Sequence, residues 1–101
     1  MIVYYKKYEY GPLSCCKKSK KVVKSIANSR EEYIADTFEA MVAQFITKDI
    51  NVIENVSKCS IKDITILNAY KSEKIFVANL AKKNELTQRE VVGVIVSSYN
   101  D

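Results

Sequence analysis

The sequence predicts a single α+β domain that is mainly helical with a small β component. Its 101 residues are enough for one hydrophobic core. The two glycines and one proline are too few for a turn-rich sandwich or barrel. Apolar residues at helical spacing run through the middle of the chain, and β-prone tyrosines gather near its start. An all-helical domain is the alternative.

The first segment, residues 1–28, is expected to hold a strand and a basic stretch. Met1 to Tyr10 alternates β-prone residues and ends at Gly11-Pro12, a dipeptide typical of a turn. Leu13 to Asn28 is rich in lysine and has only a short apolar group. One or two helical turns are expected there.

The second segment, residues 29–58, contains the clearest helical pattern. Ser29 followed by Glu32 has the spacing of a capping box. Behind it Ile34, Phe38 and Met41 begin an apolar stripe, which predicts an amphipathic helix over 30–47. The connector that follows, up to residue 58, has helical spacing but is too short to assign.

The third segment, residues 60–101, predicts two helices. The first spans 72–83, and Ser72 can cap its start. The second spans 87–99 and begins with a capping box made by Thr87 and Glu90.

The helix over 87–99 is apolar on nearly all sides, so it must be buried. A monomer of this length cannot easily cover it, which predicts a homodimer. Gly93, in the middle of this helix, costs about 1 kcal/mol relative to alanine, and close approach of a second backbone at the dimer axis would explain it. The residues expected in the dimer core are Val91, Val92, Val94, Ile95 and Tyr99.

The three cysteines, Cys15, Cys16 and Cys59, have no recognisable motif spacing. The chain has no histidine to complete a zinc site, and bridging the adjacent pair needs a strained ring. We therefore expect free thiols in a reducing, cytoplasmic location and no metal.

Several function classes are not expected. The chain has no histidine, no glycine-rich phosphate loop and no recognisable pair of catalytic carboxylates, so we expect neither an enzyme nor a cofactor or small-molecule substrate. No apolar run reaches the length of a membrane span, so a membrane partner is not expected either.

Positive charge is concentrated near the N-terminus. The net charge is +4, but residues 1–25 hold seven lysines and one acid, for a local +6. Each lysine that docks on a phosphate backbone releases a condensed counterion, so such a run can bind DNA; the alternative is a solvated loop. The candidate phosphate contacts are Lys17, Lys18, Lys20, Lys21 and Lys24.

The segment Leu80-Ala81-Lys82-Lys83-Asn84-Glu85-Leu86-Thr87-Gln88-Arg89-Glu90-Val91-Val92, continuing to Tyr99, resembles the helix pair of the ribbon-helix-helix repressors, the MetJ/Arc/CopG class. The resemblance covers about the last forty residues. It implies a homodimer whose paired strands enter the major groove of double-stranded DNA. It also implies a phosphate contact by the helix start at Thr87 and Gln88.

The resemblance makes 63–69 the ribbon strand, and two registers are possible. One turns Lys62, Ile64, Ile66 and Asn68 outward, with Lys62 and Asn68 as candidates for base contacts; the other turns Asp63, Thr65 and Leu67 outward. A helix over 61–71, capped by Ser60 and Asp63, is the alternative to a strand.

Two functions follow as hypotheses. The first is a small homodimeric DNA-binding protein that regulates transcription. The second is a structural or protein-interaction protein whose lysines only keep it in solution. The salt dependence of DNA binding separates the two, because phosphate contacts produce a steep salt slope.

Overall fold

The computed structural model describes residues 9–100. This part of the chain folds into a two-stranded sheet and four α-helices, joined by short connections and two single 3₁₀ turns. The elements, in order, are β1 (Tyr10–Cys16), α1 (Lys17–Arg30), α2 (Ile34–Thr47), η2 (Ile53–Asn55), η3 (Ile61–Asp63), β2 (Ile64–Tyr70), α3 (Lys71–Asn84) and α4 (Gln88–Ser97). The fold is therefore α+β, as predicted.

The sheet is antiparallel, and the helices cover one of its faces. Leu13 of β1 lies opposite Leu67 of β2, and both are buried. At the next pair, Ser14 lies opposite Ile66 on the outer face, where Ile66 is exposed. The register is therefore the one that turns Ile66 and Asn68 outward, and the register that turns Leu67 outward is wrong.

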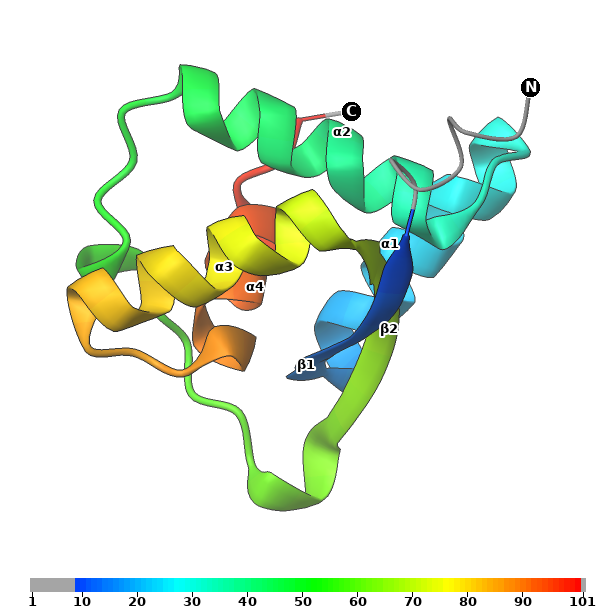
Figure 1. The fold of residues 1–101 in the computed structure, drawn as a ribbon. Helices are drawn as coiled ribbons and strands as arrows, with labels where there is room; N and C mark the ends of the chain where they lie inside the picture. The colour runs from blue at the N-terminus through cyan, green and yellow to red at the C-terminus, as the bar shows by residue number, and fades with distance from the viewer. Residues whose placement is uncertain (1–8, 101) are drawn as a thin grey trace.

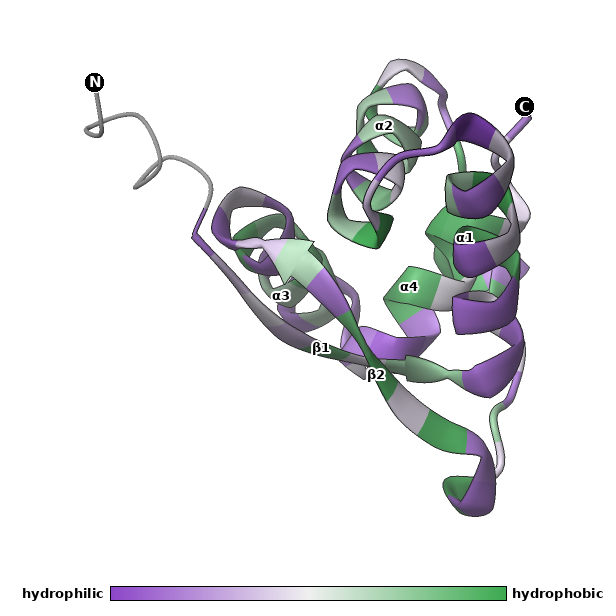
Figure 2. Ribbon diagram, turned by 90° about the vertical axis from the view of Figure 1, so that its right-hand side faces the viewer, coloured by the Kyte–Doolittle hydropathy of each residue, from purple (hydrophilic) through white to green (hydrophobic). Residues whose placement is uncertain are grey.

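The helices surround α4. In Figure 1, α2 lies across the top, α3 crosses in front of α4, and the strands lie to the right with α1 beyond them. Figure 2 shows the strands passing below α3, with α1 along the opposite side of the molecule. The Ile61–Asp63 turn, η3, is the lowest point in both views.

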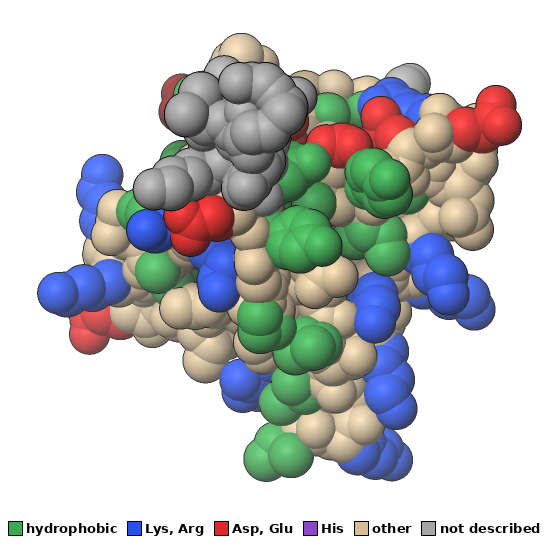
Figure 3. Space-filling view, turned by 45° about the vertical axis from the view of Figure 1, so that its right-hand side comes forward, with side chains coloured by type: hydrophobic (Ala, Val, Ile, Leu, Met, Phe, Trp, Pro, Cys, Tyr) green, Lys and Arg blue, Asp and Glu red, His purple; other side chains and the backbone are tan. Residues whose placement is uncertain are grey.

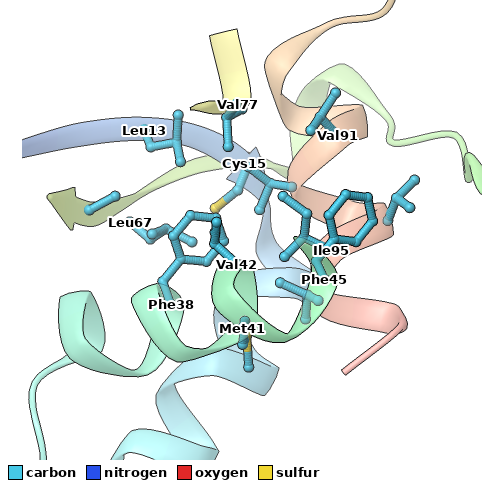
Figure 4. Close-up of a cluster of buried hydrophobic side chains, with 14 of the residues drawn as sticks. Leu13, Cys15, Phe38, Met41, Val42, Phe45, Leu67, Val77, Val91 and Ile95 are labelled. Atoms are coloured by element: carbon cyan, nitrogen blue, oxygen red, sulfur yellow. The ribbon is translucent and has the colours of Figure 1, made fainter. Parts of the chain in front are cut away.

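One hydrophobic core joins the elements. Phe38 of α2 reaches toward the inner face of the sheet and Phe45 lies beside Ile95 of α4, while Met41 lies on the side of α2 that faces α1, as Figure 4 shows. These are the residues of the predicted apolar stripe, so the stripe is correctly assigned to the core. Val77 of α3 and Val23 of α1 close the two sides.

Gly11 and Pro12 lie inside β1, so the predicted turn is wrong. Gly11 is paired with Ala69, and Pro12 with Asn68. A two-stranded sheet has two free edges, and a proline that lacks its N–H is accommodated at an edge. The strand expected over residues 1–10 falls almost wholly outside the described residues.

The strand expected over 63–69 is confirmed as β2, and the alternative helix over 61–71 is wrong apart from the single turn η3. Within the described chain β2 pairs with β1, antiparallel along its whole length. The order β2–α3–α4 thus follows the strand-helix-helix order of the resemblance, but the strand partner comes from the same chain.

The helix predicted over 30–47 begins later, and the capping box at Ser29 and Glu32 is wrong. Ser29 lies in the last turn of α1, which is a full helix of 14 residues ending at Glu31 in the left-handed conformation. Glu32 accepts a hydrogen bond from Thr37 Oγ1 at 2.7 Å instead. The buried residues of α1 are Ser19, Val23 and Ala27, which follow one another at intervals of four. Only Val23 has a sizeable apolar side chain, so the hydrophobic periodicity of this helix is weak.

Both C-terminal helices are confirmed, with small differences at their ends. The capping box of α4 is present: the Glu90 amide donates to Thr87 Oγ1 at 3.2 Å, and the Thr87 amide donates to Glu90 Oε1 at 2.8 Å. The cap predicted for α3 is wrong, because Tyr70 occupies that position and Ser72 Oγ donates to Glu73 Oε1.

The apolar side chains of α4 are buried within one chain. Val91, Val92, Val94 and Ile95 lie between the sheet, α2 and α1, and Tyr99 is half-buried beyond the helix end. The premise that a single chain cannot cover this helix is therefore wrong. A long β1 and a full-length α1 supply the covering surface that the sequence pattern did not predict.

Candidate nucleic-acid interface

The lysines of α1 form a basic surface. Lys17, Lys21 and Lys24 are exposed and lie three or four residues apart, so they share one side of the helix. That side is opposite the buried stripe of Ser19 and Val23. We call the exposed lysines 17, 18, 21 and 24 the lysine face.

The lysine face is not neutralised by its own helix. The first turn of α1 has no acidic residue, and the helix contains no Asp or Glu at all. Positive side chains near a helix N-terminus are unfavourable, because the helix dipole is positive there. Among residues 9–100 the only ion pair within 4.0 Å that is seen is between Arg30 and Glu32, at the other end of α1.

Lys20 differs from its neighbours because it is half-buried. Its charge acts on the thiol of Cys15, whose pKa burial raises to about 11 and Lys20 partly lowers. Cys15 is buried in the core and therefore stays protonated at neutral pH.

A disulfide joins the start of α1 to the loop before η3. Cys16 and Cys59 are bonded, with their Cα atoms 6.0 Å apart and a sequence separation of 43. The expectation of three free thiols is therefore wrong for these two. Antiparallel pairing places Cys16 opposite Ile64. The loop that precedes β2 and carries Cys59 therefore lies beside the end of β1. The spacing of the cysteines in the sequence does not indicate this proximity.

The disulfide forms part of the wall of a cleft of about 630 Å³. Lys17 and Lys18 reach this cleft from α1, and Arg89 reaches it from α4. Sequence reasoning did not select Arg89 or Lys58, which also lines the cleft, because neither belongs to the lysine run. Asp63 is the one acidic residue in the wall, so the charged side chains sum to +3.

The start of α4 is arranged differently from the start of α1. The Glu90 carboxylate occupies the amide end of α4, and hydrogen bonds from the Thr87 amide and hydroxyl lower the pKa of Glu90. A phosphate at Thr87 and Gln88 would meet this carboxylate. Gln88 lines a separate, smaller cleft beside Lys71 and Lys74, so the structure does not bring it together with the lysine face.

Of the two candidates for base contacts, Asn68 lies on the outer face of the sheet, and Lys62 lies in the turn η3 that precedes β2. Asn68 is exposed opposite Pro12, and Lys62 is exposed in η3 at the other end of β2. Ile66, exposed between them at 52%, and Ile61, at 83%, add apolar surface. Figure 3 shows hydrophobic side chains in a band down this face, with lysine and arginine on both sides.

Comparisons with family models, with curated proteins and with solved structures find no match for this chain. No helix in residues 9–100 combines the length and the apolar character needed to cross a membrane. The same residues hold no group of three or more potential metal-ligating side chains.

Proposed function

We propose that this protein binds double-stranded DNA through the lysine face of α1. The observation that carries the proposal is the charge of this helix, which has five lysines within its first eight residues and no acid to balance them. Such an arrangement is electrostatically unfavourable in the free protein, and a polyanion relieves it.

The spacing of the lysine face fits a phosphate backbone. At 1.5 Å per residue, Lys17 and Lys24 are roughly 10 Å apart along the helix, which corresponds to about three phosphates of one strand. Contacts of this kind hold the protein on the duplex without reading its sequence.

Sequence readout in this proposal belongs to the outer face of β2, as in the ribbon-helix-helix resemblance. Lys62 and Asn68 can donate hydrogen bonds to base acceptors in the major groove. Ile66 between them can contact a thymine methyl group, so its exposure is compatible with a groove surface. A role in transcription regulation and a homodimer are part of the same proposal.

The salt dependence of duplex binding tests the proposal. In fluorescence anisotropy titrations over a range of salt concentrations, the wild-type protein should give a steep linear fall of log affinity with log salt. Replacing Lys21 and Lys24 together with glutamine should reduce that slope by roughly 1.8, because each lost phosphate contact removes about 0.9.

The matched control replaces Lys82 and Lys83, two exposed lysines in the last turn of α3, with glutamine. This control changes the net charge equally, at a helix end on the far side from α1 in Figure 1. A slope that the two double variants lower equally, or that is flat in the wild type, would overturn the proposal.

A structural or protein-interaction role is the second candidate. The exposed isoleucines of the outer sheet face favour it, because a soluble protein rarely shows a continuous apolar band without a partner. A flat salt slope in the same titration supports this candidate over DNA binding.

A further inference from the structure

The disulfide between Cys16 and Cys59 lies near the surface and outside the hydrophobic core. Both cysteines are half-buried, and both line the cleft of about 630 Å³ beside the start of α1. Neither belongs to the cluster of buried side chains that joins the helices to the sheet. A small thiol can therefore reach this disulfide, and its reduction leaves the core contacts in place.

The disulfide holds a segment that has few other attachments. We call residues 57–63, which directly precede β2, the tethered segment. All of its residues except Cys59 are exposed. Among the described residues, the hydrogen bonds of this segment join only its own members and Ile64, which follows it. Between its two chain ends, the position of the segment against α1 therefore depends on the bond from Cys59 to Cys16.

The tethered segment carries a lysine that the disulfide places beside the lysine face of α1. Lys58 lines the same cleft as Lys17 and Lys18. Its neighbour Cys59 is bonded to Cys16, the residue directly before α1. The disulfide thus joins lysines from two segments far apart in sequence into one basic surface. The charge density of such a surface decides how strongly it attracts a polyanion.

We propose that this disulfide is a redox switch for the binding of duplex DNA, an inference that rests on the proposed function. In the oxidised protein, Lys58 is held beside the lysine face and adds a phosphate contact. In the reduced protein, the tethered segment is free to move and this contact is lost. The protein then keeps its fold and binds duplex DNA more weakly.

The partner in the reaction is a small thiol–disulfide couple of the glutathione class. A thiolate of the reductant attacks one sulfur of the protein disulfide, a mixed disulfide forms, and the bond between the two protein sulfurs breaks. The departing sulfur keeps the electron pair and takes a proton. A second thiolate then releases the other protein sulfur as a thiol, and the reductant leaves as its own disulfide. Cys15 takes no part, because burial raises the pKa of its thiol to about 11.

Limited proteolysis with trypsin tests the release of the tethered segment without any DNA. Trypsin cleaves after lysine, and Lys58 and Lys62 both lie in this segment. Cleavage at these two residues should be roughly tenfold faster after reduction by glutathione, because a less restrained loop enters a protease more readily. Mass spectrometry identifies the cleaved bonds. Cleavage at Lys82 and Lys83, in the last turn of α3, is the internal control and should keep its rate.

A variant that cannot form the disulfide separates its loss from other effects of the reductant. The double variant Cys16→Ser, Cys59→Ser should be cleaved in the tethered segment at the rate of the reduced wild type, with or without glutathione. Circular dichroism of this variant and of the reduced wild type should show the helical signal of the oxidised protein. Loss of that signal would overturn the inference, because a switch requires a fold that survives reduction.

Anisotropy titrations with duplex DNA test the effect on binding. The salt slope of the oxidised wild type should exceed that of the reduced protein by about 0.9, since one phosphate contact is lost on reduction. Lys58→Gln should lower the slope of the oxidised protein by the same amount and should remove the redox difference. Lys83→Gln changes the net charge equally and should leave the redox difference as it is in the wild type.

The outcomes distinguish failure of the switch from failure of DNA binding. Equal trypsin rates in both redox states overturn the switch, whatever the salt slope of the wild type. A redox difference in the slope that persists in Lys58→Gln overturns the role given to Lys58. A flat slope in both redox states overturns duplex binding and with it the regulation of that binding, while the trypsin rates still report the release of the segment.

Discussion

At the scale of single residues, the cysteines illustrate how environment decides chemistry. Cys15 and Cys16 are neighbours in sequence, but they point to opposite sides of β1 because side chains alternate along a strand. Cys15 enters the core, where burial raises the pKa of its thiol to about 11. Cys16 faces the loop that carries Cys59 and forms the disulfide.

The disulfide closes a long loop, and its loss should destabilise the protein. Cross-linking residues 43 apart removes chain entropy from the unfolded state, so reduction should lower the free energy of unfolding by about 2–4 kcal/mol. Urea titrations with and without a reductant measure this difference. In the double variant Cys16→Ser, Cys59→Ser, the reductant should have no further effect; three free thiols in the untreated wild-type protein would contradict the disulfide.

At the scale of elements, the predictions that held rest on strong local signals. The apolar stripe of α2 and the capping box of α4 each involve residues three or four apart, so the sequence alone identifies them. The start of α2 and the full length of α1 were missed because Ser29 and Glu32 have capping-box spacing by coincidence. The buried side of α1 contains Ser19 and Ala27, which carry little hydrophobic signal.

The capping box of α4 should contribute measurably to stability. Thr87→Ala removes the hydroxyl that accepts from the Glu90 amide, and it should lower the free energy of unfolding by about 1 kcal/mol at neutral pH. Thr87→Ser keeps the hydroxyl and is the control. Equal stabilities of the Ala and Ser variants in urea titrations would contradict this role.

The same box makes part of the stability depend on pH. Hydrogen bonds from Thr87 lower the pKa of Glu90 from its ordinary value of 4.5, so the folded protein holds this carboxylate in its charged form. The stability it adds is fully present above pH 4.5 and is lost as the pH falls through the lower, folded-state pKa. In Thr87→Ala, the loss of stability as the pH falls through the folded-state pKa of Glu90 should be smaller.

At the scale of the whole molecule, α4 has a different environment from the one expected. It was expected to pack against a second copy, and it packs instead among α1, α2 and the sheet of its own chain. The homodimer stays a prediction, but it now depends on a surface other than α4. Within the described chain β2 has a strand partner on one edge only, and pairing of the other edge with a second copy would extend the sheet.

Light scattering at micromolar concentration tests that prediction. A homodimer should give about twice the chain mass of 11.5 kDa. The mass of a single chain would contradict the proposed pairing of strands between two copies. The lysine face of α1 would then be tested on its own by the salt slope.

The sequence by itself left residues 61–71 open between a strand and a helix, whereas it determined the helical stripe of α2, the capped start of α4 and the uneven distribution of charge. Each of these depends on residues close together in the chain, whose physical preferences can be read locally. Only the tertiary structure decided the register of β2, the disulfide between Cys16 and Cys59, and the cleft that brings Ser19 to Gly93 and Arg89. These depend on contacts between segments far apart in sequence, because strand pairing and burial in one shared core set which side chains meet.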